Sequence, residues 1–327
     1  MANAGSFDAI PMLDFHDSIT NKQDFLVKLR EAIVNVGFLY GKNTDFPVHL
    51  VDELKTLLPA LFSIPVSEKA QIQLENSPHF LGYSGVGDET TAGRSDQREQ
   101  FEFISSQHEN WKPGLPLHLR LAGPNQYPTS LPQAPKVIDA YMKSMTGFAS
   151  RFVELVSEAL GLPTDTFLTY LSHQNRLKIV RYPEADGEGG CQGVGPHKDS
   201  SGWWTFLLKA SSPDVKGLQV LNKAGAWIDV PNIPGTFVIN IGQASEVITH
   251  GTCVRGDLTK KEVLTFLAHH FQEQSAESNE GAQIDSAFLK GKYDTWGESQ
   301  LRTKIRSHRK AGRRFYPEVY EQYINGA

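Results

Sequence analysis

The chain has 327 residues, 39% of them apolar, which is enough for one domain with a substantial core. Its 37 acidic and 32 basic residues nearly balance, so the charge indicates neither nucleic-acid binding nor attraction to an anionic membrane. Cys191 and Cys253 are the only cysteines, too few for a disulfide framework or a cysteine zinc site. No segment reads as a signal peptide or a membrane span. We therefore expect a soluble, cytoplasmic, monomeric protein with a small-molecule partner.

Helical patterns dominate residues 1–170. Apolar residues at helical spacing predict a first helix between Thr20 and Gly37 and a second around residues 51–58. A glycine-rich loop precedes a short strand at residues 101–103. The longest helical pattern runs from Pro135 to about Leu160 and ends at Gly161. These helices are expected to pack on the outside of a core formed by the rest of the chain.

Short strands replace helices after residue 170. They are predicted at residues 177–182, 205–208, 218–221, 227–230, 236–241 and 246–249, and turn residues separate nearly all of them. Such regular spacing is typical of a sandwich or barrel of antiparallel strands. We expect one α+β domain whose β core covers residues 171–275, followed by a polar and basic extension over residues 276–327.

The motif that suggests chemistry is Pro196-His197-Lys198-Asp199. Residues two apart in a strand point to the same side, so His197 and Asp199 can offer an imidazole nitrogen and a carboxylate oxygen to one metal ion. With one distant histidine they would leave three open positions on Fe(II), as oxygen and a chelating co-substrate require. A His-x-Asp pair also arises by chance in many proteins, so the motif indicates a metal only in its context.

The context is a run of further motifs downstream of the pair. They are Trp203-Trp204, Gly217-Leu218-Gln219-Val220, Gly225-Ala226-Trp227-Ile228-Asp229-Val230 and the segment 234–242, which reads PGTFVINIG. This run resembles the core of the isopenicillin N synthase-like family of Fe(II)/2-oxoglutarate-dependent dioxygenases, whose pattern is H-x-D, G-L-Q-V, G-x-W-x-x-V and P-G-x-x-V-x-N-x-G-D. Further resemblance, in part to fungal members, lies at residues 10–15, 37–40, 62–69, 82–101, 293–298 and 316–318, so most of the chain is covered.

The resemblance implies a double-stranded β-helix, or jelly-roll, core with flanking N-terminal helices. It implies Fe(II) and 2-oxoglutarate as cofactors, O2 as co-substrate, and the hydroxylation, desaturation or ring formation of a small organic molecule; fungal members often act in secondary metabolism. His197 and Asp199 match the first two iron ligands of the family. Tyr182 matches a position whose phenol often meets a co-substrate carboxylate, a half-buried strand tyrosine being the alternative. Asn240 matches an asparagine near the site, with a turn role as its alternative.

The chain departs from the family after Gly242. The family's third iron ligand lies in an H-R-V sequence and its co-substrate arginine in R-x-S, and neither occurs here. Counting without gaps places the third ligand at about Leu258. His250 is the nearest histidine, but the extended chain between the two would span roughly 26 Å, which favours a turn or surface histidine over a ligand. Arg255 or Lys260 is a candidate for the carboxylate contact, and arginine suits it better because it binds bidentately.

Beyond Val254 the sequence departs from the family as though a segment present in the family had been removed. Three interpretations of the iron site stay open. An active oxygenase would complete its iron site with an unplaced third ligand, and no catalytic residue beyond the metal ligands is expected. An iron oxidase would use O2 without 2-oxoglutarate. A catalytically impaired or truncated homologue would keep the fold and hold metal weakly, since two ligands compete poorly with water.

Overall fold

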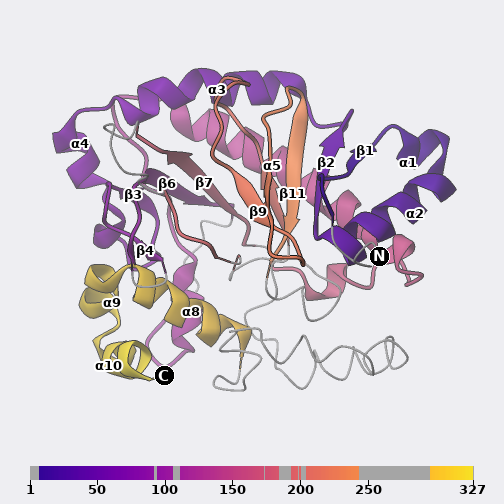
Figure 1. The fold of residues 1–327 in the computed structure, drawn as a ribbon. Helices are drawn as coiled ribbons and strands as arrows, with labels where there is room; N and C mark the ends of the chain where they lie inside the picture. The colour runs from indigo at the N-terminus through magenta and orange to yellow at the C-terminus, as the bar shows by residue number, and fades with distance from the viewer. Residues whose placement is uncertain are drawn as a thin grey trace.

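The computed structural model describes residues 7–91, 94–105, 111–172, 174–183, 193–197, 199, 204–242 and 295–326. Within these ranges, helices cover one face of a group of sheets that are antiparallel except for the parallel pair β1 (Met12–Asp14) and β2 (Phe38–Lys42), and a helical C-terminal segment lies at one end (Figure 1). The expected strand at residues 246–249, together with His250 and Arg255, lies outside the described residues. No helix in the described ranges is both long enough and apolar enough to cross a membrane.

Two sheets position the site. The four-stranded sheet has the order β1 (Met12–Asp14), β2 (Phe38–Lys42), β11 (Thr236–Ile241) and β8 (Trp204–Leu207). The three-stranded sheet has the order β3 (Gly82–Ser84), β6 (Glu99–Ile104) and β7 (Arg176–Arg181), with antiparallel pairing throughout. Two short pairs complete the strands: β9 (Gln219–Leu221) with β10 (Trp227–Asp229), and β4 (Thr90–Thr91) with β5 (Arg94–Ser95).

The N-terminal helices confirm the periodic patterns. They are α1 (Asp17–Thr20), α2 (Lys22–Glu31), a π-helical turn at Ala32–Val36, α3 (Val48–Phe62) and α4 (Val66–Gln71). Short 3-10 turns follow at Leu74–Asn76, Leu117–Leu121 and Leu168–Tyr170. Gly37 ends the first helical stretch with φ +80°, a left-handed conformation that glycine adopts without steric cost.

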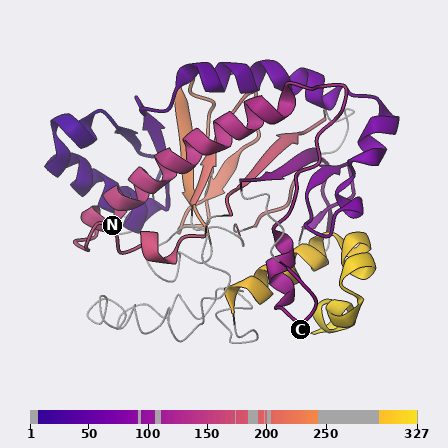
Figure 2. The ribbon, with the colours of Figure 1, turned by 180° about the vertical axis from the view of Figure 1, so that it is seen from behind.

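Helix α5 (Ala134–Ala159) is the long helix that the sequence predicts. It ends in a Schellman motif, because Gly161 has φ +75° and the Leu162 amide donates to the Ser157 carbonyl at 2.9 Å. Seen from behind, α5 runs across the sheets with α3 beside it (Figure 2). One face of both large sheets is therefore covered by helix.

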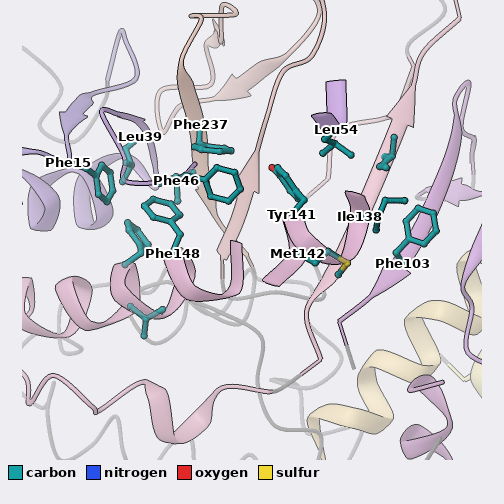
Figure 3. Close-up of a cluster of buried hydrophobic side chains, with 14 of the residues drawn as sticks. Phe15, Leu39, Phe46, Leu54, Phe103, Ile138, Tyr141, Met142, Phe148 and Phe237 are labelled. Carbon is teal, nitrogen blue, oxygen red and sulfur yellow. The ribbon is translucent and has the colours of Figure 1, made fainter. Parts of the chain in front are cut away.

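The main core lies between these helices and the sheets (Figure 3). Because side chains alternate along a strand, Phe101 and Phe103 of β6 and Phe237 and Ile239 of β11 face this core. Trp204 is partly buried and packs edge-on against Phe152 of α5 with ring centroids 4.8 Å apart. Trp203 lies outside the described residues. The intervening residues of these strands, such as Glu102 and Asn240, lie on the opposite face of each sheet.

The C-terminal residues 295–326 form α8 (Trp296–Ser307), α9 (Arg309–Phe315) and α10 (Pro317–Asn325). Thr295 starts α8 with a capping box shared with Glu298. A second core joins these helices to Leu74, Phe80 and Leu121. Within it the rings of Tyr316 and Phe80 stack with their centroids 5.6 Å apart. This part of the expected extension is therefore packed against the N-terminal half of the chain.

Candidate metal site and an adjoining charge cluster

The side chains of His197 and Asp199 lie side by side. Nε2 of His197 is 3.6 Å from Oδ1 of Asp199, and both side chains are partly exposed. Nδ1 of His197 is 2.8 Å from the Gly195 carbonyl oxygen, so it carries the proton of the neutral imidazole and donates to that carbonyl. Nε2 then carries a lone pair in the neutral imidazole, where it is available to a metal ion, and carries a proton that faces Asp199 when the ring is protonated.

The strands β8 and β11 hold Asp199 in place. Thr205 and Asn240 are paired residues on these strands, so their side chains emerge on the same face. The Thr205 hydroxyl donates to Oδ2 of Asp199 at 2.7 Å, and the Asn240 amide donates to the same oxygen at 2.9 Å. One carboxylate oxygen is thus fixed by two donors, and the other faces His197. The Asn240 contact supports the site role over the turn role.

The contact between His197 and Asp199 shifts the pKa values of both side chains. Burial would raise the pKa of Asp199, but hydrogen bonds from His197, Thr205 and Asn240 outweigh it and lower the pKa to about 2. The pKa of His197 is raised, chiefly by its hydrogen bond with Asp199, while burial and the charge of Arg98 act in the opposite direction. Asp199 is therefore a permanent anion at neutral pH.

This donor set fits an iron ion. A nitrogen lone pair and a carboxylate oxygen face each other, and the outer atoms of both ligands are hydrogen-bonded, as is usual for metal-binding histidine and aspartate. Among the described residues, no third histidine, cysteine, aspartate or glutamate joins the pair. The expected candidates His250 and Arg255 fall outside those ranges.

Tyr182 lies immediately after β7 and is half exposed. Its ring contacts Gly193 so closely that a Cβ at that glycine would come within 2.4 Å of the ring. Gly193 opens the short segment that leads to His197. The predicted co-substrate tyrosine and the predicted metal ligands are therefore brought to the same part of the molecule.

The hydrogen bond from Thr205 to Asp199 gives a direct test of this site. We expect Thr205→Val, which keeps the shape and removes the donor, to weaken Mn(II) binding about 10- to 100-fold, the usual cost of losing an outer-shell partner of a metal ligand. The matched control is Thr56→Val on the exposed face of α3, where the affinity should not change. Equal affinities in the two variants would rule out Asp199 as a metal ligand.

A second group of ionisable residues, which sequence patterns do not reveal, lies at the face of β6 and β7 opposite the main core. Glu102 is fully buried and contacts Lys178, Lys304 and Arg176 at 3.3, 2.5 and 3.2 Å. Glu89 contacts Arg98 at 2.8 Å and Lys178 at 3.4 Å. Buried His308 of the C-terminal segment completes this charge cluster, with Nε2 3.7 Å from Glu89. The cluster joins α8 and α9 to the sheet.

Glu89, Glu102 and His308 are close enough to share a metal ion, but their surroundings argue against one. Ammonium and guanidinium groups already neutralise both carboxylates, and a divalent cation would be repelled by them. Burial would raise the pKa of Glu89, yet Lys178 and His308 help to lower it to about 2. The cluster is a structural ion-pair network in a low-dielectric environment.

His308 makes this network sensitive to acid. Burial and neighbouring cations lower its pKa to about 4, so between pH 6.5 and 4 the unfolded chain binds a proton that the folded chain does not. Stability is therefore lost as pH falls through this window. We expect the free energy of unfolding to decrease by about 2 kcal/mol more between pH 7 and pH 5 in the wild type than in His308→Gln. Urea denaturation at both pH values measures this difference, and equal decreases would contradict it.

Known proteins resemble this chain in sequence and in fold. The N-terminal model of non-haem dioxygenases in morphine synthesis matches residues 10–130, and the model of the 2OG-Fe(II) oxygenase superfamily matches residues 167–265. A solved 2OG-Fe(II) oxygenase family protein from Caulobacter crescentus has a TM-score of 0.62 at 24% identity, covering 76% of this chain and 80% of its own. A Neurospora crassa structure in complex with alpha-KG and thymine has a TM-score of 0.62 at 20% identity, covering 78% and 80%. These likenesses confirm the double-stranded β-helix fold.

Curated relatives extend over nearly the whole chain. The 2-oxoglutarate-dependent dioxygenase frbJ of Dothideomycetidae sp. (strain 11243) is 36% identical, covering 96% of this chain and 94% of its own. A 2-oxoglutarate-dependent dioxygenase of Gibberella zeae is 30% identical, covering 97% and 94%. The first alignment spans 351 positions, more than the 327 residues of this chain, so the relative has residues without a counterpart here. At this identity and coverage, the chain belongs to the 2OG-Fe(II) oxygenase superfamily.

Proposed function

We propose that this protein oxidises a small organic molecule in a reaction that depends on Fe(II), O2 and 2-oxoglutarate and releases succinate and CO2. The observation that carries the proposal is the paired arrangement of His197 and Asp199, with Nε2 and Oδ1 3.6 Å apart and the outer oxygen of Asp199 fixed by two donors. Preorganised ligands of this kind bind a metal without first being ordered. The fungal relatives support the choice of co-substrate.

Each residue of the site has a proposed task. His197 and Asp199 would hold the iron, which when bound supplies the redox chemistry between O2, 2-oxoglutarate and substrate. Asp199 stays ionised at neutral pH and partly offsets the charge of the ion. Tyr182 would donate a hydrogen bond to a co-substrate carboxylate, and Arg255 is proposed to pair with the far carboxylate. His250 is the candidate third ligand with the least support.

A second candidate function rests on the missing family motifs. The chain lacks H-R-V and R-x-S, and its alignment with the first relative contains positions that this chain does not fill. A homologue that lost the third ligand would keep the fold and bind iron weakly. An iron oxidase independent of 2-oxoglutarate would instead lose only the co-substrate arginine. Both alternatives keep His197 and Asp199 together.

Substrate class and setting are also proposals. The near balance of charges favours a small molecule over a nucleic acid, and no described helix is suited to span a membrane. Hydroxylation, desaturation or ring formation in secondary metabolism fits the fungal relatives. A cytoplasmic monomer is the simplest state consistent with the sequence.

One experiment separates the candidates. The full chain is loaded anaerobically with Fe(II), and metal binding, O2 consumption and succinate release are followed with and without 2-oxoglutarate. The proposed oxygenase binds iron at one saturable site and releases succinate only when 2-oxoglutarate is present. Oxygen consumption that ignores 2-oxoglutarate indicates the iron oxidase. Absence of saturable binding indicates the impaired homologue and overturns the proposal.

A further inference from the structure

Arg98 immediately precedes β6 and Tyr182 immediately follows β7, its neighbouring strand. In the antiparallel register of β6 and β7, Glu99 pairs with Arg181, so the next pair along the two chains is Arg98 with Tyr182. Directly opposed residues of an antiparallel pair project their side chains on the same face, about 5 Å apart. That face also carries Glu102 and Lys178, lies opposite the face that packs into the main core, and is contacted by Lys304 of α8. The guanidinium and the phenol therefore share one surface of the sheet.

The same segment is tied to the loop that carries the metal ligands. The Gln97 amide donates to the Gly193 carbonyl at 2.8 Å, and the Tyr182 ring rests on Gly193. His197 follows four residues later and is held by the carbonyl of Gly195. Arg98, the Tyr182 phenol and the loop that carries the metal ligands therefore lie close together.

Arg98 itself is fixed by acidic partners. One of its terminal nitrogens lies 2.8 Å from Glu89 and 3.0 Å from Asp96, and the side chain is only 11% exposed. Burial would lower the pKa of Arg98, but Glu89, Tyr182 and Asp96 raise it, Tyr182 acting as a hydrogen-bond partner. Its buried Nε has no acceptor among the described residues, although buried guanidinium groups normally use each N–H. Glu89 and Asp96 thus hold one terminal nitrogen of Arg98 in a fixed position.

We infer that Arg98 is a positioning residue for the co-substrate, which donates a hydrogen bond to the Tyr182 hydroxyl oxygen and so leaves the phenol proton for a carboxylate of 2-oxoglutarate. A phenol that accepts from a cation is a stronger donor, because the cation polarises the O–H bond. Glu89 and Asp96 fix the guanidinium in the required place. This inference rests on the proposed function.

The test is a double-mutant cycle on 2-oxoglutarate binding. Calorimetry measures binding of 2-oxoglutarate to the Mn(II)-loaded full chain for wild type, Arg98→Lys, Tyr182→Phe and the double variant. Arg98→Lys keeps the charge beside Glu89 but lacks the planar fork needed to reach both the acids and the phenol. Mn(II) affinity and melting temperature are measured separately for each protein. Arg94→Lys, an exposed position on β5, is the matched control.

We expect each single substitution to raise the Kd for 2-oxoglutarate roughly tenfold and the double variant to raise it no further, with Mn(II) affinity unchanged. Effects that multiply in the double variant would show that Arg98 acts independently of Tyr182. An unchanged Kd in Arg98→Lys, or a parallel loss of Mn(II) affinity or melting temperature, would overturn the inference while leaving the proposed function standing. If wild-type protein binds Mn(II) but no 2-oxoglutarate, both the proposed function and the inference about Arg98 fail.

Discussion

His197→Ala is expected to remove saturable Fe(II) binding and to lower succinate release at least roughly a hundredfold, because losing a mere outer-shell partner already costs about 10- to 100-fold. The imidazole contributes the Nε2 lone pair that faces Asp199, and alanine offers no donor in its place. Asp199→Ala should have the same effect through loss of the carboxylate. Anaerobic Fe(II) titration and succinate assays under identical conditions provide both measurements.

The control for this experiment is His49→Ala. His49 is an exposed histidine on α3, so its removal takes away an imidazole without touching the site. If His197→Ala and His49→Ala bind iron equally well, the pair described above is not the metal site. If both alanine variants at 197 and 199 keep their melting temperatures while losing iron, the loss is local rather than a failure to fold.

Glu102→Gln is expected to destabilise the fold by about 3–5 kcal/mol, the usual cost of removing one partner from a buried ion pair. Its carboxylate is completely buried and faces Lys178, Lys304 and Arg176, which would be left without their shared anion. Glutamine keeps the volume, so the effect reports charge rather than packing. Denaturant unfolding at pH 7 measures the change.

The matched control is Glu75→Gln. Glu75 pairs with Lys310 at 3.2 Å on the surface, and the lysine is 78% exposed. An exposed pair contributes about 0–1 kcal/mol, so the two substitutions should differ several-fold. Similar destabilisation by both would show that the buried network is solvated in solution.

The sequence predicts the fold wherever a local pattern decides the structure. The apolar period of α5 and its glycine terminus are visible in the chain, since helix formation depends on residues a few positions apart. The His-x-Asp spacing likewise anticipates the contact between His197 and Asp199. Asn240, by contrast, becomes a partner of Asp199 through the register of β8 with β11, which places it beside Thr205.

Long-range packing explains the parts that the sequence does not reveal. Glu89, Glu102, Lys304 and His308 are separated widely in the chain and carry no motif, yet they form one buried network. Arg98 becomes a candidate positioning residue only because the pairing of β6 with β7 places it beside Tyr182. The third ligand is a different case, because the family motif that would identify it is absent from the chain.

The position of the C-terminal helices has a consequence for how the protein is made. Lys304 of α8 and His308, which precedes α9, lie against the charged face of β6 and β7, and a ribosome synthesises them long after those strands. Until Lys304 and His308 leave the exit tunnel, Glu102 has no partner from the last helices and its face of the sheet stays hydrated. The domain therefore reaches its final state only after synthesis of these helices, although its N-terminal helices can form earlier.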